Sequence, residues 1–318
     1  MKDKYGRNID YLRVSLTDRC NLRCIYCMPK EGVNLLRHED VLRFNEVIKI
    51  VKAFSYLGIK KVRYTGGEPL ILKGIEELIF ETRKISSIKD ISITTNGLLL
   101  YELADDLKNA GLNRVNISLD TLKPDRYKEI TRGGEINKVF KAIEKALKIG
   151  LAPLKLNVVL VKGINDDEIK DFIYLTKEFP IEIRFIELMP IGEGKEYFKR
   201  GYIKSQDILE EFPELKPIDH NNKIADMYKI NGGRGAVGFI SPLSCKFCET
   251  CNRMRLTSIG TIKPCLHSQE EISIKEFMYD EEQLIRVIRA AVINKPLEHL
   301  LNSDGISKSK RQMYQIGG

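Results

Sequence analysis

The chain has 318 residues, of which 43% are hydrophobic and 30% are charged, and its formal net charge is +8. This balance is typical of a globular protein with a large core, and no apolar run approaches the ~18 residues that span a bilayer. The sequence therefore excludes a transmembrane helix, and with no secretory signal at its start it predicts a cytoplasmic protein with no membrane partner. Lysines are scattered along the chain, so the positive charge does not predict binding to nucleic acid.

From residue 10 to about 190, short β-branched runs alternate with longer amphipathic segments. One such segment, 44–58, repeats apolar residues at three- and four-residue steps, which is typical of a helix with one buried face. Gly58, Gly111 and Gly150 stand where predicted helices end. The runs expected to form strands are 11–16, 61–65, 91–95, 115–119, 155–160 and 183–187.

This alternation predicts six βα units with a parallel sheet, either as an open doubly wound sheet or as an incomplete barrel. In both arrangements ligands bind at the carboxyl ends of the strands. Polar clusters at those ends favour one shared site. They are 20–27, 66–69, 94–97, 118–120 and 187–190.

The alternation fades after about residue 195, and Pro213, Pro217 and the polar stretch 219–223 mark a boundary. We therefore predict two domains, 1–220 and 221–318. The helices expected in the second domain are 280–293 and 295–302.

The seven cysteines form one group near each end of the chain, and in a reducing compartment such groups indicate metal sites and not disulfides. The first group, C-x3-C-x2-C at Cys20, Cys24 and Cys27, offers three thiolates on one loop. Three thiolates can hold three corners of a four-iron cluster and leave one iron open to a small molecule. The alternative is a zinc knuckle completed by His38, because a structural zinc site needs four ligands.

Tyr26 stands directly before the third cysteine, and with it the loop resembles the C-x3-C-x-aromatic-C signature of the radical S-adenosylmethionine superfamily. The turn GGEP at 66–69 resembles the turn with which that superfamily binds the methionine end of the cofactor, and Glu68 can pair with an ammonium group. The resemblance implies that the open iron binds S-adenosylmethionine, whose reductive cleavage releases a 5′-deoxyadenosyl radical. The three cysteines of the first group are then the catalytic cluster ligands.

The second group has the spacing C-x2-C-x13-C at Cys248, Cys251 and Cys265, and Cys245 stands at C-x2-C spacing before it. Three hypotheses fit this spacing: a four-cysteine zinc ribbon, a four-iron cluster with four protein ligands, and a four-iron cluster with one open iron. Two arginines beside the group favour a cluster that binds substrate, since guanidinium groups bind phosphates and have little purpose around a closed zinc site.

The motif C-x2-C-N-R-x-R-L-T, followed by the later Cys-Leu pair, resembles the GTP 3′,8-cyclase family of molybdenum cofactor biosynthesis. This resemblance implies an α/β fold, an incomplete (β/α)6 barrel of TIM type whose mouth is closed by a smaller C-terminal α+β domain. It also implies that Cys248, Cys251 and Cys265 hold a second cluster whose open iron binds guanine, with Cys245 outside the ligand set. Further matches cover almost the whole chain: RNIDYLRVSLTDRCNLR at 7–23, RYTGGEP at 63–69, TTNG at 94–97, NISLDTL at 116–122, ELMP at 187–190 and the terminal Gly317-Gly318.

The same resemblance implies residue roles, including a C-terminal glycine tail that reaches the active site. Cations within the predicted strands support a buried anion site, because a charge that faces inward from a sheet needs an anionic partner. The implied S-adenosylmethionine contacts are Tyr26, Gly67, Ser118 and Met189. The implied GTP contacts are Arg13, Arg63, Thr94, Lys155, Arg253 and Arg255.

The reaction implied is the conversion of GTP to (8S)-3′,8-cyclo-7,8-dihydroguanosine 5′-triphosphate, in which hydrogen is taken from ribose C3′ and the ribose radical attacks guanine C8. It needs two [4Fe-4S] clusters, S-adenosylmethionine and a reducing electron donor, and its product would pass to a cyclic pyranopterin monophosphate synthase. A homodimer is compatible with the sequence. The alternatives are a two-cluster radical enzyme that modifies a peptide or a tRNA, and a zinc-binding interaction protein.

Overall fold

The computed structural model describes residues 1–219, 224–299, 301, 307 and 309–317. Within them one sheet runs in the order β12-β11-β10-β1-β2-β3-β4-β5-β6-β9-β8-β7. Its strands are β1 (Tyr11–Ser15), β2 (Lys61–Thr65), β3 (Asp90–Thr95), β4 (Arg114–Ser118), β5 (Leu154–Leu160), β6 (Ile181–Glu187), β7 (Lys216–Pro217), β8 (Asp226–Lys229), β9 (Ala236–Ile240), β10 (Arg253–Leu256), β11 (Thr261–Lys263) and β12 (Ile272–Ser273). The helices are α1 (Phe44–Tyr56), α2 (Ile75–Arg83), α3 (Leu100–Asn109), α4 (Pro124–Thr131), α5 (Ile136–Lys148), α6 (Ile169–Glu178), α7 (Gly194–Gly201), α8 (Ser205–Glu211), α9 (Glu281–Ile293) and α10 (Met313–Ile316).

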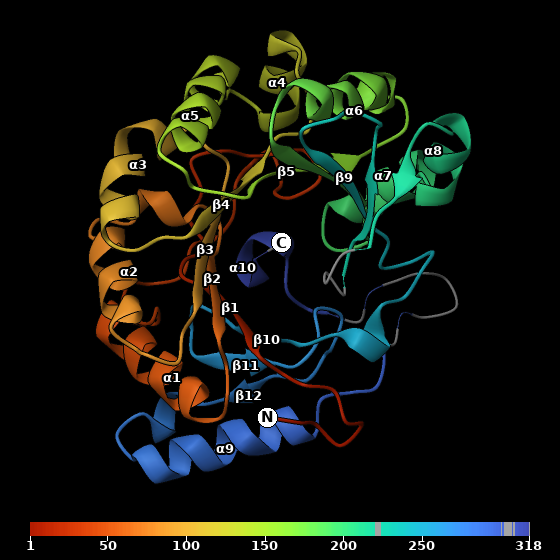
Figure 1. Cartoon of the computed structure of the whole chain (residues 1–318). Helices are drawn as coiled ribbons and strands as arrows, with labels where there is room; N and C mark the ends of the chain where they lie inside the picture. Colours follow the sequence, from red (N-terminus) through yellow and green to blue (C-terminus); the bar gives the residue numbers. More distant parts are fainter. Residues whose placement is uncertain (220–223, 300, 302–306, 308, 318) are drawn as a thin grey trace.

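Strands β1 to β6 lie side by side in chain order, and each pairs in parallel with the next. The sheet curls around an interior with helices on its outer side, and its two edge strands, β12 and β7, are not paired with each other (Figure 1). The prediction of an incomplete parallel barrel is therefore confirmed, and the open doubly wound alternative is not. The six predicted strands are all present, with ends within two residues of the predicted ones.

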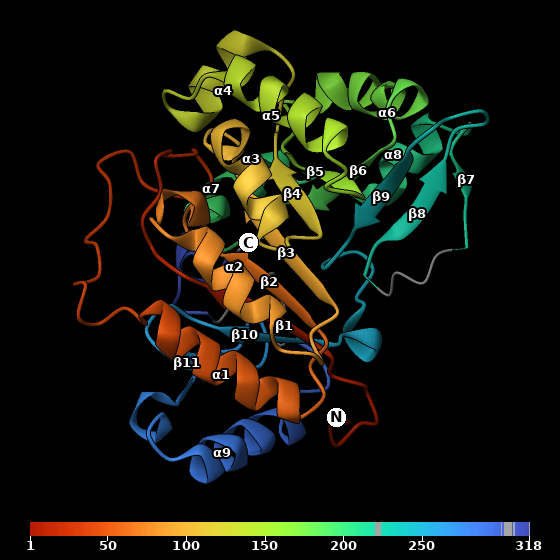
Figure 2. The ribbon, with the colours of Figure 1, turned by 60° about the vertical axis from the view of Figure 1, so that its left-hand side comes forward.

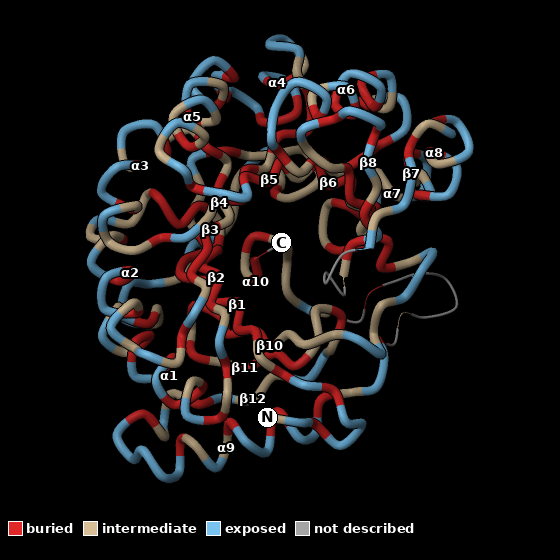
Figure 3. The backbone as a smooth tube through the Cα atoms, viewed as in Figure 1, coloured by how far each residue is buried: buried red, intermediate tan, exposed pale blue. Residues whose placement is uncertain are grey.

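The strands alternate between apolar and polar side chains, and the alternation separates the two faces of the barrel. In β1, Leu12 and Val14 are fully buried in the hydrophobic core between sheet and helices. Arg13 and Ser15 stand at the intervening positions and so face the other side, which is the barrel interior. The tube in Figure 3 shows the strands almost continuously buried while the outer helices expose one side. The barrel interior is consequently a buried polar surface.

The C-terminal part of the chain extends the same sheet at both edges. β9 pairs in parallel with β6, and β10 pairs in parallel with β1. The antiparallel strands β11 and β12 continue beyond β10, while β8 and β7 continue beyond β9. Figure 2 shows these strands on either side of the six βα units. The second cysteine group, which precedes and follows the β10–β11 hairpin, is thereby brought to the side of β1.

One predicted helix is wrong. The helix predicted over 280–293 is present as α9 (Glu281–Ile293), but 295–299 are not helical, and residues 300 and 302 lie outside the described residues. The backbone carbonyls of Lys295, Pro296 and Leu297 accept hydrogen bonds from Arg7 and so are not used in a helix. In the described part of the chain, no helix is long and apolar enough to cross a bilayer.

Candidate active site

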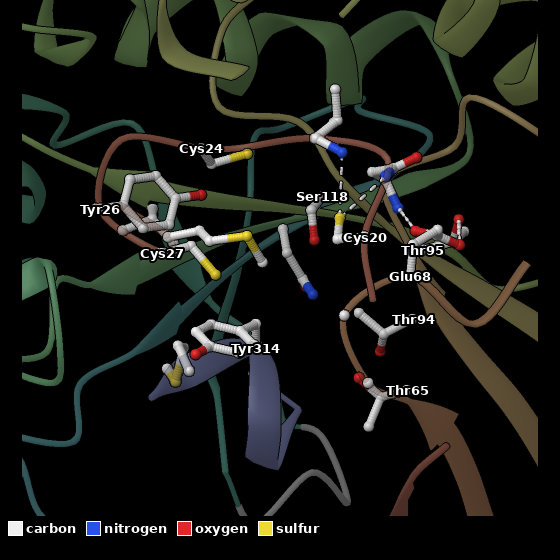
Figure 4. A pocket seen from close by; sticks show the side chains of 18 of the residues that line it. Cys20, Cys24, Tyr26, Cys27, Thr65, Glu68, Thr94, Thr95, Ser118 and Tyr314 are labelled. Atoms are coloured by element: carbon white, nitrogen blue, oxygen red, sulfur yellow. Dashed lines mark hydrogen bonds between the residues drawn. The ribbon is translucent and has the colours of Figure 1, made fainter. Parts of the chain in front are cut away.

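The first cysteine group lies on the loop that leaves the carboxyl end of β1. Cys20, Cys24 and Cys27 are each half-buried, and all three line one cavity of about 180 Å³. The loop turns tightly because the amides of Cys27 and Met28 both donate to the carbonyl of Cys24. Figure 4 shows the three thiols around one space, with Tyr314 across from them. The structure thus brings the three predicted ligands together.

Two N–H groups lie within hydrogen-bond distance of the sulfur of Cys20. The amide of Leu22 lies 3.4 Å from the sulfur of Cys20, and Nδ2 of Asn96 lies 3.9 Å from it. Burial raises the pKa of Cys20 to about 11 and that of Cys27 to about 12. Binding of iron would favour the thiolates, and the N–H donors would then stabilise the sulfur ligand.

The glycine turn after β2 packs directly against this loop. The amide of Gly67 donates to the carbonyl of Thr17 at 2.7 Å, and the amide of Glu68 donates to the carbonyl of Arg19 at 2.8 Å. A Cβ atom added at Gly67 would stand 2.1 Å from the carbonyl oxygen of Arg19, which is far inside van der Waals contact. A glycine is therefore required for the turn to reach the segment that precedes Cys20.

Glu68 fixes this turn to the end of the neighbouring strand. Its carboxylate accepts hydrogen bonds from the amide of Leu70 at 3.0 Å, the hydroxyl of Thr95 at 2.7 Å and the amide of Asn96 at 2.7 Å. Burial raises its pKa to about 7. The sequence suggested a partner for an ammonium group, but in this structure both carboxylate oxygens are engaged by the chain itself. Glu68 is thus a residue that holds the β2 and β3 ends together.

The other predicted S-adenosylmethionine contacts line the same cavity. Tyr26, Ser118 and Met189 are among its lining residues, together with Gly67. The hydroxyl of Tyr26 donates to the carboxylate of Asp120, whose second oxygen accepts from the amide of Val159 at 2.8 Å. Burial raises the pKa of Asp120 to about 6. These bonds hold the aromatic ring of the cysteine loop against the ends of β4 and β5.

The second cysteine group lines a second cavity of about 120 Å³. Cys248 and Cys251 precede β10, and Cys265 follows β11. The long spacing between Cys251 and Cys265 is therefore a hairpin, turned at Gly260, that returns the chain to its start. All three thiols are half-buried, whereas Cys245 is exposed and is not among the lining residues.

The two cavities adjoin. Ile186 at the end of β6 and Met189 after it line both of them. Arg13, Arg253 and Arg255 line the second cavity. A molecule bound against the second cysteine group would therefore lie beside one bound against the first.

A row of cations crosses the inner face of the sheet, and two of its members, Arg13 and Arg255, line the second cavity. Arg13 pairs in register with Arg255 on one side and with Arg63 on the other. The guanidinium of Arg63 stacks on the ring of Tyr11, 5.5 Å from its centroid. Burial, followed by the charges of Arg255 and Arg63, lowers the pKa of Arg13. So many buried like charges make this surface a strong attractor for an anion.

Three predicted GTP contacts lie apart from the second cavity. Arg63 and Lys155 line neither cavity, although both are buried on the inner face of the sheet. Lys155 forms an ion pair with Glu182 at 2.6 Å, which Arg184 shares at 2.8 Å. Thr94 lines the first cavity, with the predicted S-adenosylmethionine contacts.

The C-terminal tail enters the barrel, and Figure 1 shows its helix α10 surrounded by the strands. Tyr314 lines the first cavity, and the guanidinium of Arg255 donates to the carbonyls of Ile316 at 3.2 Å and Gly317 at 2.7 Å. Gly317 has φ +66, and an added Cβ would stand 2.2 Å from Cγ2 of Thr65. Gly318, the other half of the predicted tail, lies outside the described residues.

Sequence reasoning missed several residues of the site. Asp120 lies in 118–120, one of the polar clusters predicted at the strand ends. Arg184, like Arg13, is a cation within a predicted strand. Both residues could therefore have been predicted from the sequence. Tyr314 lies in the four-residue helix α10, and Lys295 lies in the irregular segment after α9, and both segments are too short or too irregular for a periodic pattern to predict where a side chain points.

Comparison with known proteins places this site in a family. The sequence matches the Radical SAM superfamily over residues 14–175 and Molybdenum Cofactor Synthesis C over residues 181–301. It is 57% identical over 319 residues to a GTP 3′,8-cyclase of Clostridium botulinum (strain Hall) and 53% identical over 319 residues to one of Clostridium acetobutylicum, and both alignments cover 100% of each chain. The chain belongs to the GTP 3′,8-cyclase family. The family resemblance inferred from the cysteine motifs is thus confirmed, and neither the peptide- or tRNA-modifying alternative nor the zinc-binding interaction protein is favoured.

Solved structures share the fold at much lower identity. Streptococcus suis SuiB bound to S-adenosylmethionine has a TM-score of 0.60 and 16% identity, and the match covers 97% of this chain and 77% of that one. Native anSMEcpe with bound AdoMet has a TM-score of 0.55 and 17% identity, covering 89% of this chain and 84% of that one. At this identity the likeness concerns the fold alone, and it agrees with the incomplete barrel.

The cofactors of a radical S-adenosylmethionine family fit the residues present. Each cysteine group borders a cavity, while in the described ranges no three His, Cys, Asp or Glu side chains converge on a single metal ion. Near the first group, Gly67 lines the cavity, and an added Cβ there would collide with the carbonyl of Arg19. The hydroxyl of Thr94 and the side-chain oxygen of Asn157 are buried at that cavity without a hydrogen-bond partner. A polar ligand beside the first cysteine group would satisfy them.

Proposed function

We propose that this chain converts GTP to (8S)-3′,8-cyclo-7,8-dihydroguanosine 5′-triphosphate in molybdenum cofactor biosynthesis. One observation carries the proposal most directly: two three-cysteine groups border adjoining cavities of one polar barrel, and Ile186 and Met189 line both. A reaction between two molecules requires them to be held in contact, and adjoining cavities provide this. Membership of the GTP 3′,8-cyclase family supports GTP as the substrate.

We assign the residues as follows. The first cluster would be held by Cys20, Cys24 and Cys27, and the second by Cys248, Cys251 and Cys265, each with one iron left for a ligand. S-adenosylmethionine would contact Tyr26, Gly67, Ser118 and Met189. GTP would contact Arg13, Arg63, Thr94, Lys155, Arg253 and Arg255. Cys245 stays outside both sets because it is exposed and borders neither cavity.

When bound, the reduced first cluster and S-adenosylmethionine supply a radical that can take a hydrogen atom from the ribose. The chain itself binds, orients and excludes water. Gly67 lets the glycine turn pack against the segment before Cys20, and Tyr26, held by its hydrogen bond to Asp120, lines the same cavity. Arg255 links the tail carbonyls to the second cavity, so the tail and GTP would be ordered together.

The proposal is tested by anaerobic reconstitution of the full chain with iron and sulfide, followed by incubation with S-adenosylmethionine, dithionite and GTP. We expect one 5′-deoxyadenosine for each cyclised nucleotide, and no cyclised product from ATP. Formation of 5′-deoxyadenosine without any cyclised GTP would reject the substrate assignment, and absence of both products would reject the reaction class.

Lys155 provides a pH-dependent test of the GTP assignment. Burial and then the charge of Arg184 lower its pKa to about 8. If the ammonium of Lys155 binds a phosphate, the form that binds is already protonated below about pH 8. Above pH 8 the free side chain is mostly neutral and must take up a proton when GTP binds. KM for GTP should therefore rise about tenfold per pH unit above about pH 8. The substitution Lys155→Arg, which keeps the charge, should flatten the profile between pH 7.5 and 9.5. Superimposable profiles for both proteins would contradict the assignment.

Several further predictions stay proposals. The chain would need an external electron donor, would deliver its product to a cyclic pyranopterin monophosphate synthase, and would act in the cytoplasm. A homodimer and the division into domains 1–220 and 221–318 also remain to be tested. The parallel pairing of β9 with β6 and of β10 with β1 implies that the two parts share one sheet and would unfold together.

A further inference from the structure

Arg7 lies outside both cavities, yet all five of its N–H groups are bonded. Nε donates to the carboxylate of Asp3 at 2.6 Å. Nη1 donates to the carbonyls of Cys248 at 2.9 Å and Leu297 at 2.7 Å. Nη2 donates to the carbonyls of Lys295 at 3.3 Å and Pro296 at 2.7 Å. A guanidinium has five N–H donors, so this one is saturated, and its contacts join the N-terminus to the second cysteine group.

Hydrogen bonds within the N-terminal segment fix the position of the Arg7 guanidinium. The carboxylate of Asp3 also accepts from the amides of Tyr5 at 3.0 Å and Arg7 at 2.9 Å, which closes a tight loop. The amide of Lys4 donates to the carbonyl of Ile293, the last residue of α9. Asp3 and Arg7 are both buried. Burying an ion pair costs desolvation energy, and it is tolerated when the remaining donors of the pair also form hydrogen bonds. The pair of Asp3 and Arg7 meets this condition, because every N–H group of the Arg7 guanidinium is bonded.

Lys295 continues the same network to the other cysteine segment. Its carbonyl accepts from Arg7, and its ammonium donates to the carbonyl of Pro264, the residue before Cys265. The side chain is buried and lines the second cavity, and among the described residues no carboxylate lies within ion-pair distance of it. A buried ammonium without a carboxylate needs another source of negative charge.

Cys248, Cys251 and Cys265 line the same cavity as Lys295, and thiolates that ligate a cluster there would supply that charge. Arg7 hydrogen-bonds the backbone of Cys248, and Lys295 hydrogen-bonds the backbone of the residue before Cys265. The two residues are connected to each other because the carbonyl of Lys295 accepts a hydrogen bond from Arg7. The hairpin alone does not fix this separation, because Cys265 lies two residues beyond the end of β11.

We propose that Arg7 and Lys295 are positioning residues that hold the two cysteine segments of the second group at the separation a cluster needs. The inference rests on the proposed function, since it takes the second group as a cluster site. The proposal gives the N-terminal segment a structural role, although that segment lines neither cavity. Neither residue needs to contact GTP for this role.

The test compares the same substitutions in two full-length backgrounds. In one, Cys20, Cys24 and Cys27 are replaced by Ser, so that only the second group can bind iron. In the other, Cys248, Cys251 and Cys265 are replaced by Ser. Arg7→Gln, Arg7→Lys, Lys295→Met and Lys295→Arg are introduced into each. Arg37→Gln is the control, because both ion pairs of Arg37, with Glu39 and Asp40, are exposed. Iron, sulfide and the electron paramagnetic resonance spectrum of the reduced cluster are measured after anaerobic reconstitution.

Arg7→Gln and Lys295→Met should lower iron at the second group at least threefold and leave iron at the first group unchanged. Arg7→Lys, which keeps the ion pair but has fewer donors, should retain iron with an altered resonance spectrum, and Lys295→Arg should restore at least half of the iron. An equal loss of iron in both backgrounds would show general destabilisation and would overturn the inference. Full retention of iron in every variant would also overturn it. A second group that binds no iron even with Arg7 and Lys295 intact would overturn the proposed function as well.

Discussion

Replacement of Gly67 by Ala is expected to lower 5′-deoxyadenosine formation at least about 100-fold, because displacement of a reacting group by roughly 1 Å can cost that much. The added Cβ would meet the carbonyl oxygen of Arg19 at 2.1 Å and the carbonyl carbon at 2.6 Å. Both are backbone atoms and cannot rotate away. The segment that leads into Cys20 must therefore shift relative to the glycine turn, and the predicted S-adenosylmethionine cavity shifts with it. The measurement is the initial rate of 5′-deoxyadenosine release by the reconstituted enzyme with GTP and dithionite.

Gly232→Ala is the matched control for backbone strain. Gly232 has φ +74, and an added Cβ there meets no atom within 4 Å. The substitution should therefore cost about 1–2 kcal/mol of stability through its left-handed backbone and leave the rate unchanged. A Gly67→Ala enzyme that cleaves S-adenosylmethionine as fast as the Gly232→Ala enzyme would contradict the assignment of the turn.

Replacement of Arg63 by Met is expected to change GTP binding and stability in opposite directions. Arg63 is buried, and burial lowers its pKa to about 10. Among the described residues it has no carboxylate within ion-pair distance; its Nε bonds only the hydroxyl of Ser92, at 3.3 Å. Removing a buried cation without an anionic partner should raise the free energy of unfolding of the GTP-free protein by about 1–2 kcal/mol. If a phosphate is that partner, KM for GTP should rise about 100-fold.

Arg126→Met supplies the contrast, because Arg126 is an arginine that already has partners. It forms ion pairs at 2.5 Å with Asp167 and with the fully buried Glu168. Its loss should lower the free energy of unfolding by about 1–3 kcal/mol and leave KM for GTP unchanged. Steady-state kinetics and denaturant unfolding of both variants check the two signs. An Arg63→Met protein that is destabilised and binds GTP normally would show that Arg63 serves the fold and not the substrate.

The alternation of strands and helices was sufficient to predict six βα units with a parallel sheet, whereas the choice of an incomplete barrel over an open sheet came from the family resemblance. The six predicted strands lie within two residues of those observed, and the cations inside them are buried as expected. This works because alternation within a strand reports which side chains share a face. The first cysteine motif worked for a different reason, since its spacing alone places three thiols on one loop, whereas the second group is brought together by the β10–β11 hairpin.

What could not be predicted depends on segments distant in the chain. β9 and β10 have only five and four residues, and nothing local to them indicates that they pair with β6 and β1. The segment after α9 was expected to be helical because its composition allows a helix. Its carbonyls instead accept hydrogen bonds from Arg7, which lies nearly three hundred residues earlier in the chain. Tertiary contacts override local preference in such places.

The most direct test of the account is the iron and sulfide content of four full-length proteins reconstituted anaerobically. These are the wild type, the two variants in which one cysteine group is replaced by Ser, and the variant in which both are replaced. We predict about eight iron atoms per wild-type chain, about four in each single-group variant and none in the double variant, with an equal amount of sulfide throughout. Zinc in place of iron, or a second-group variant that still binds as much iron as the wild type, would contradict the claim that two separate three-cysteine cluster sites face one shared barrel interior.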